Sequence, residues 1–149
     1  MIKVDDALAG VTRLGVDTPA VIYFIEANPT YDHIVTNIFQ RISNAALLGI
    51  TSTITLAEVL VQPIRRTDAT LVLQYSELLT RSDNFRMLSI DREVAERAAH
   101  IRATYNIRIP DALQVGSALS AGCEACLTND HDLRRVTDLR VLVLEELEL

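Results

Sequence analysis

The 149-residue sequence has little glycine, proline, cysteine or lysine, and each shortage narrows what the chain can be. Only five glycines and four prolines occur, so no low-complexity linker is present, and we expect one domain spanning residues 1–149. No segment reaches the ~18 uninterrupted apolar residues of a membrane-spanning helix. Residues 1–17 contain one lysine, two early aspartates and no long apolar stretch. We therefore expect no secretory signal and a cytoplasmic location.

The two cysteines, Cys123 and Cys126, form a C-x-x-C motif. Two thiolates do not complete a tetrahedral zinc site, and a thioredoxin-like role needs the motif at a helix N-terminus. Here the motif runs into a strand-like segment, where its odd spacing would point the two side chains to opposite faces. We interpret both as small packing residues, with a redox or metal role as the alternative.

The charge balance is acidic, with a net charge of −6 and a pI of about 5.0. This argues against a protein that coats nucleic acid. It does not argue against an enzyme acting on nucleic acid, because an acidic metal site adds negative charge that a bound cation offsets. Lys3 is the only lysine among the 14 basic residues. Arginine suits phosphate contact, although a biased genomic composition would produce the same excess.

Apolar residues make up 49% of the chain, enough for a full core. Short apolar runs alternate with longer helical patterns, which predicts βα units and a three-layer α/β/α fold with a mainly parallel central sheet. We expect strands at 13–16, 50–54, 85–90, 125–128 and 141–144. We expect helices at 5–11, 19–27, 31–48, 55–61, 68–80, 92–105 and 110–122. Gly49 should close the third helix, and the fourth should end near Pro63.

Four acidic residues from distant parts of the chain stand beside apolar runs, where a charge is costly without a partner. Asp17 and Asp130 closely follow strand-like runs, and Glu58 and Asp111 fall in the first turn of expected helices. Sites in parallel sheets form beyond the carboxyl ends of the strands, so all four could meet at one edge. Converging carboxylates would make an oxygen-ligand site for Mg²⁺ or Mn²⁺. Such a site points to metal-assisted phosphoryl chemistry.

Each acid also has a structural explanation of its own. Glu58 with Thr55 matches a capping box, and Asp111 at a helix start is stabilised by the helix dipole. Asp130 lies in a polar stretch typical of a turn, and a turn role is open for Asp17 as well.

The segments that carry the four acids resemble the motifs of the PIN-domain ribonucleases, in particular the VapC-like toxins of bacterial and archaeal toxin–antitoxin pairs. The segments are residues 17–23 (DTPAVIY), 53–60 (TITLAEVL), 109–114 (IPDALQ) and 127–130 (LTND). Their order and spacing agree with the family, and the resemblance runs from about Leu14 to Leu144. Gly116 departs from it, because a glycine inside the last long helix costs about 1 kcal/mol relative to alanine.

The resemblance implies the site residues. The metal-binding and catalytic acids would be Asp17, Glu58, Asp111 and Asp130, holding Mg²⁺ or Mn²⁺. Thr18, Thr128 and Asp132 would support them, with Thr128 orienting carboxylates and Asp132 as a fifth acid or an outer group. A general-base role for His131 is the alternative to a surface turn residue, and we favour the turn.

The resemblance also implies an endoribonuclease toxin that hydrolyses RNA phosphodiester bonds, leaves a 3′-hydroxyl product and binds a cognate antitoxin. A homodimer is implied too. The apolar positions of 31–48 and 68–80 could form its interface, though core burial explains them equally well. The alternatives are a chromosomal PIN nuclease of RNA processing or DNA repair without an antitoxin, and a non-cleaving module that binds RNA or protein. A haloacid-dehalogenase phosphatase is disfavoured, because Asp17-Thr18-Pro19 lacks the D-x-D motif.

Overall fold

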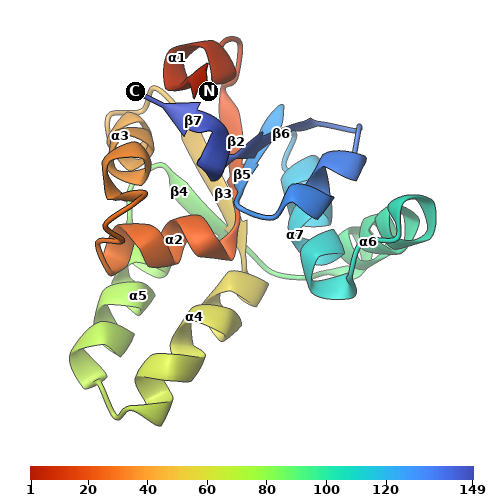
Figure 1. Ribbon diagram of the computed structural model, residues 1–149. Helices are drawn as coiled ribbons and strands as arrows, with labels where there is room; N and C mark the ends of the chain where they lie inside the picture. The colour runs from red at the N-terminus through yellow and green to blue at the C-terminus, as the bar shows by residue number, and fades with distance from the viewer.

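The computed structural model describes residues 1–149 around a five-stranded sheet of order β4-β3-β2-β5-β6 (Figure 1). The strands are β2 (Arg13–Val16), β3 (Leu48–Ser52), β4 (Phe85–Leu88), β5 (Ala125–Thr128) and β6 (Arg140–Val143). Every neighbouring pair is parallel. The five expected strands and the parallel sheet are confirmed, with ends that shift by up to two residues.

Helices cover both faces of the sheet, which confirms the three-layer α/β/α fold. They are α1 (Val4–Ala7), α2 (Thr18–Ile25), α3 (Asp32–Ser43), α4 (Thr53–Arg65), α5 (Ala69–Arg81), α6 (Arg92–Tyr105) and α7 (Ile109–Ser120). In Figure 1, α2 and α3 lie on one side of the sheet, α6 and α7 lie on the other, and α4 and α5 form a hairpin that extends beyond it. None of these helices has the length and apolar character needed to span a bilayer.

The strands divide the core in two, because successive side chains point to opposite faces. Leu14 and Val16 belong to the apolar cluster under α2, α3 and α5. Gly15 faces α7, where an added Cβ would lie 2.8 Å from the Cβ of Ala118. Glycine at this position therefore lets α7 pack directly on the strand that ends at Asp17.

The apolar positions of α3 and α5 serve this core. Ile38 and Ile42 of α3, and Tyr75 and Leu79 of α5, are buried in the same cluster within one chain. Core burial thus accounts for these apolar patterns without an interface between chains.

Gly116 has a packing reason. A Cβ at this position would lie 3.1 Å from the carbonyl oxygen of Val94 and 3.3 Å from the amide nitrogen of Ala98. The glycine allows α6 and α7 to approach backbone to backbone, which offsets its unfavourable helix propensity. The position of α7, and of Asp111 in its first turn, depends on this contact.

The third helix is shorter than expected, and Gly49 does not close it. Helix α3 ends at Ser43, and Gly49 lies inside β3. An added Cβ on Gly49 would approach the side chains of Phe85 and Ile42 to within 2.7 and 2.8 Å. The glycine therefore marks close packing in the sheet. The sequence pattern overran the helix because the apolar residues that follow it, 45–48, lie in the turn and at the start of β3.

Helix α4 also begins earlier than expected. Ser52, not Thr55, is its N-cap, and the Ser52 hydroxyl accepts a hydrogen bond from the Ile54 amide at 3.2 Å. Pro63 lies inside the helix, which continues to Arg65. Glu58 is consequently in the second turn. Both its placement in the first turn and its capping box with Thr55 were wrong.

Cys123 and Cys126 are free, buried and part of the same apolar cluster beside α6 and α7. The prediction of opposite faces was wrong, because Cys123 precedes β5 in the turn after Gly122, whose φ is +75°. Burial raises the pKa of each thiol to about 12, so both stay protonated at neutral pH. Their role as packing residues agrees with this environment.

A second, two-stranded parallel sheet joins the ends of the chain and was not predicted. It pairs β1 (Ile2–Lys3) with β7 (Leu147–Glu148), and the Lys3 ammonium donates a hydrogen bond to the Leu149 carbonyl at 2.5 Å. The 3₁₀ helix η2 (Leu144–Glu146) connects β6 to β7. Helix α1 is shorter than the expected segment 5–11.

Candidate active site

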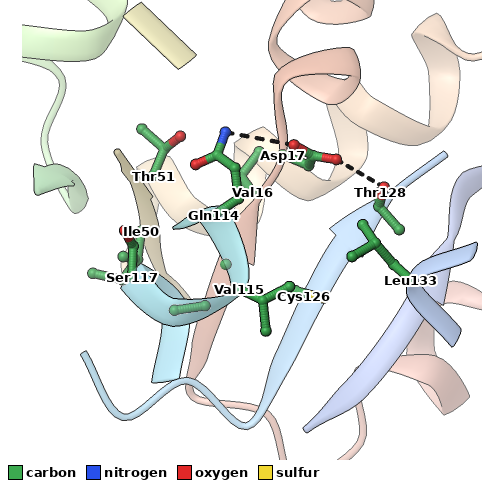
Figure 2. A pocket seen from close by; sticks show the side chains of 12 residues that line it. Val16, Asp17, Ile50, Thr51, Gln114, Val115, Ser117, Cys126, Thr128 and Leu133 are labelled. Carbon is green, nitrogen blue, oxygen red and sulfur yellow. Dashed lines mark hydrogen bonds between the residues drawn. The ribbon is translucent and has the colours of Figure 1, made fainter. Parts of the chain in front are cut away.

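Asp17 stands at the carboxyl end of β2 and caps the N-terminus of α2. The Thr18 amide donates to its Oδ1 at 2.9 Å, and the Thr128 hydroxyl donates to its Oδ2 at 2.8 Å. Thr128 ends the neighbouring strand β5, so the parallel pairing of β2 and β5 brings the two side chains together (Figure 2). Both carboxylate oxygens are thereby oriented by local donors.

The charge on Asp17 is nevertheless poorly compensated. Burial raises the pKa of Asp17 to about 6, against the lowering effect of the hydrogen bonds from Thr128 and Thr18. The negative charges of Asp111 and Glu58 raise this pKa further. Asp111 and Glu58 are therefore both close enough to Asp17 to influence its charge.

Glu58 approaches this group through Thr18. The Thr18 hydroxyl donates to Glu58 Oε1 at 2.9 Å, while its backbone N–H binds Asp17. One residue at the start of α2 thus fixes the orientation of two acids on different elements.

Asp111, Asp130 and Asp132 line a small pocket, which we call the outer pocket. Asp130 is the N-cap of the 3₁₀ helix η1 (His131–Arg135), and its Oδ1 accepts from the Asp132 amide at 2.9 Å. The Asp130 amide donates to the Thr128 hydroxyl at 3.0 Å, which connects this pocket to Asp17. The pocket is lined by Asn106, Ile107, Arg108, Asp111, Asp130, Asp132 and Arg135.

Two arginines compensate two of the three acids of this outer pocket, Asp111 and Asp132. Arg108 Nε binds Asp111 Oδ2 at 3.2 Å with its side chain 79% exposed. Arg135 Nη2 lies 3.0 Å from Asp132 Oδ1, and its Nη1 donates to the Tyr105 carbonyl at 3.3 Å. The Arg135 side chain is therefore held by both Asp132 and the Tyr105 carbonyl, whereas the Arg108 side chain is held only by Asp111.

The chemistry of these side chains suits a hard divalent cation, because the acids supply oxygen ligands. The negative charge of Asp17, close to Asp111 and Glu58, is also not balanced by a nearby cation. In the observed conformation, however, no three His, Cys, Asp or Glu side chains lie close enough to hold one ion. One oxygen of Asp111 is engaged by Arg108. Binding one ion through several of these acids therefore requires side chains to rotate, and a rotation of Asp111 would break its pair with Arg108.

His131 does not face the acids. Its Nε2 lies 2.6 Å from Glu145 Oε2, and both side chains are exposed. This geometry fits a surface turn residue better than a general base.

The residue that sequence reasoning left without a role is Gln114, which lies within the third motif. Its amide is buried at the centre of the acidic edge, beside Asp17 (Figure 2). The only available signal was a polar residue on the apolar face of a helix, one turn after Asp111.

Residues 15–139 match the family profile described as PIN domain. A comparison with curated proteins finds no match. Solved structures with the same fold include a toxin–antitoxin complex from Klebsiella pneumoniae, with 20% identity, 89% of this chain and 98% of that chain covered, and a TM-score of 0.68.

Two further structures are similar over most of the chain. VapBC-1 from nontypeable Haemophilus influenzae is 21% identical over 91% of this chain and 100% of its own, with a TM-score of 0.66. The Mycobacterium tuberculosis toxin VapC20, described as cleaving the sarcin–ricin loop, is 14% identical over 77% of this chain and 87% of its own, with a TM-score of 0.62. At these identities the likeness shows a shared fold.

Proposed function

Because this chain belongs to the PIN-domain family, we propose that it is a divalent-metal-dependent endoribonuclease and the toxin of a toxin–antitoxin pair. The observation that carries the proposal is the placement of Asp17, a half-buried carboxylate at the carboxyl end of β2 that Thr18 joins to Glu58. Burial and the charges of Asp111 and Glu58 raise its pKa to about 6. A bound dication would relieve this uncompensated charge.

Asp17, Glu58, Asp111 and Asp130 would hold the ion. When bound, Mg²⁺ or Mn²⁺ supplies a polarised phosphodiester oxygen and a water of lowered pKa. The chain's own residues prepare the ligands. Thr18 and Thr128 fix the two oxygens of Asp17, and Thr18 also orients Glu58.

The outer pocket offers contacts for RNA. Arg108 is exposed at its rim and bound only to Asp111. When Asp111 turns to a metal ion, the guanidinium becomes free to bind a phosphate of the substrate. Local positive charge of this kind reconciles RNA binding with a net charge of −6.

Two observations support an antitoxin partner: the similarity to toxin–antitoxin structures and an exposed apolar surface on the α4–α5 hairpin. Two of the similar structures are toxin–antitoxin assemblies. In this chain Val61, Ile64 and Leu73 are exposed on the α4–α5 hairpin, where an apolar segment of a partner could bury them. The homodimer that the family resemblance implies would also use exposed apolar residues of this kind, so a second copy of the chain and the antitoxin could compete for this hairpin.

The test of the chemistry is Asp17→Asn and Asp111→Asn, assayed on single-stranded RNA with Mg²⁺. Each variant removes one ligand charge. The stabilisation of the transition state that a metal supplies is worth several kcal/mol, so we expect cleavage to fall by ~100-fold or more. Asp83→Asn is the matched control, because Asp83 is exposed in the turn before β4 at the other end of the sheet. Wild-type rates in either site variant would refute the metal-site assignment.

The test of the toxin role is expression together with the adjacent gene. We expect a tight complex in which Mg²⁺-dependent cleavage is masked and returns when the partner is removed. Cleavage with no such partner would instead support a PIN nuclease of RNA processing or DNA repair.

A further inference from the structure

Gln114 of α7 reaches residues from several elements at the acidic edge. It is 9% exposed and lies one turn after Asp111. Its amide nitrogen lies 2.5 Å from the Thr55 hydroxyl, 3.3 Å from the Thr18 hydroxyl and 3.5 Å from Asp17 Oδ1. Figure 2 shows the amide directed toward Asp17, with the contact drawn as a dashed line.

The orientation of the amide is fixed from behind. The Ser52 hydroxyl, at the N-cap of α4, donates to Gln114 Oε1 at 2.6 Å. A carbonyl oxygen accepts and an NH₂ group donates, so this contact turns the nitrogen toward the acids. The opposite rotamer would place NH₂ against the Ser52 hydroxyl and an oxygen beside the carboxylate of Asp17.

The hydroxyl groups around Gln114 then have only one consistent arrangement of protons. Each threonine hydroxyl has a single proton to donate. The proton of Thr18 goes to Glu58, so in the 3.0 Å contact between Thr18 and Thr55 the donor is Thr55. Thr55 in turn accepts from Thr51 at 3.0 Å and from the Gln114 amide. The chain of donors therefore runs from Thr51 through Thr55 and Thr18 to the carboxylate of Glu58.

We infer that Gln114 is a positioning residue for the proposed metal site, setting the direction of this hydroxyl chain so that Asp17 and Glu58 receive hydrogen bonds from fixed, uncharged donors. The inference rests on the proposed function. Neutral donors orient the carboxylates without cancelling the charge that a dication needs. Arg108 and Arg135, by contrast, compensate the charges of the outer acids.

A purely space-filling role does not explain this residue. A buried amide costs free energy unless its polar atoms are paired, and an apolar side chain would fill the same space without that cost. Both ends of the Gln114 amide are paired, and every donor it offers leads toward an acid. Residues that orient metal ligands in this way typically change metal affinity or activity 10–100-fold when they are replaced.

The experiment compares Gln114→Met with Ser117→Ala by the Mn²⁺ dissociation constant in the absence of RNA. Methionine keeps most of the volume and removes the hydrogen bonds. Ser117 is the matched control, because it is buried on the same helix and donates only to the Leu113 carbonyl. We expect Gln114→Met to weaken Mn²⁺ binding about tenfold or more and Ser117→Ala to change it less than twofold.

Further measurements distinguish a failure of this inference from a failure of the proposed function. The Mg²⁺ concentration for half-maximal cleavage should rise with the Mn²⁺ constant, while the KM for RNA stays unchanged. If Gln114→Met does not fold, Thr55→Val breaks the same chain with an isosteric residue and should weaken Mn²⁺ binding in the same way. Affinities within twofold of wild type in the folded variants would overturn the inference. Wild-type protein that binds Mn²⁺ but cleaves no RNA would instead overturn the proposed function.

Discussion

Two carboxylates at opposite ends of the same pair of strands behave in opposite ways. Asp17 follows β2, and Glu124 precedes β5, so about four residues of strand, roughly 13 Å, separate their positions. Glu124 accepts from the Thr12 amide at 3.1 Å, the Arg13 amide at 2.7 Å and the Thr12 hydroxyl at 2.7 Å. Desolvation raises the pKa of Glu124, but these hydrogen bonds outweigh it and lower the pKa to about 2.

The contrast shows how the surroundings of Asp17, the proposed metal ligand, differ from those of an acid that joins two strands. Asp17 also accepts two good hydrogen bonds, yet its pKa rises to about 6. Glu124 is exposed and accepts from three donors, whereas Asp17 accepts from two, is desolvated by burial and lies near the charges of Asp111 and Glu58. Glu124 joins β5 to the start of β2 through hydrogen bonds at the amino edge of the sheet. The charge of Asp17, by contrast, is not balanced by the groups around it.

The largest expected effect is stabilisation by metal. At a free Mn²⁺ concentration of 100 times the dissociation constant, wild-type protein should gain about 2.7 kcal/mol in the free energy of unfolding. Glu124→Gln should gain as much, because Glu124 is far from the site. Asp17→Asn should gain little. Thermal unfolding with and without Mn²⁺ measures this, and equal gains in all three proteins would erase the contrast between the two carboxylates.

The pH dependence of stability should separate Asp17 from its surroundings. Its folded pKa lies above the ordinary 3.8, so its contribution to stability is present below pH 3.8 and is lost as pH rises through about 6. Asparagine does not titrate. As the pH rises from about 3.8 to about 6, the free energy of unfolding of Asp17→Asn should therefore increase by up to about 2–3 kcal/mol relative to that of the wild type. Urea unfolding at several pH values tests this, with Asp83→Asn as control, and parallel curves would contradict it.

Glu124 should show the reverse dependence. Its folded pKa lies below the ordinary 4.5, so its contribution is present above pH 4.5 and is lost as pH falls through about 2. At pH 7 we expect Glu124→Ala to cost about 1–2 kcal/mol through lost hydrogen bonds, with RNA cleavage unchanged. A loss of cleavage in a folded Glu124→Ala protein would contradict the distinction between Asp17 as a proposed metal ligand and Glu124 as a structural residue.

The smallest effect should come from Arg108, whose partner Asp111 extends the comparison to an acid with a nearby cation. Arg108→Gln should weaken binding of a non-cleavable RNA analogue a few-fold in the presence of Mn²⁺ and reduce the salt dependence by about one unit of slope. Mn²⁺ binding should strengthen slightly, because Asp111 is released. Arg92→Gln is the control, since Arg92 is 92% exposed and also paired with an acid, Glu96. Equal RNA affinities in the two variants would argue against phosphate contact by Arg108.

Much of the fold was predictable because local signals agreed with the tertiary structure. The strands Arg13–Val16 and Ala125–Thr128 are apolar runs with clear polar ends, and both were placed correctly. Helix α6 spans Arg92–Tyr105 as expected, with Asp91 as its N-cap accepting from the Val94 amide at 2.9 Å. The match to the PIN domain confirms the family that the four motifs indicated.

The failures share one cause, which is that the deciding contacts join residues far apart in sequence. Gly49 was read as a helix end because its packing against Phe85 is invisible along the chain. The capping box offered as one explanation of Glu58 was wrong because its hydrogen-bond partner, Thr18, lies 40 residues away. Gln114 was passed over because its contacts with Ser52 and Thr55 span about 60 residues.

The pairing of β1 with β7 has a consequence for the order of folding. The Lys3–Leu149 hydrogen bond closes a loop of 146 residues, and the entropy of closing so long a loop opposes its formation until the intervening sheet has collapsed. We expect this two-residue pair to be the last contact made and the first lost. Its amides should exchange hydrogen by local fraying, long before those of β2 and β5 open with the whole molecule.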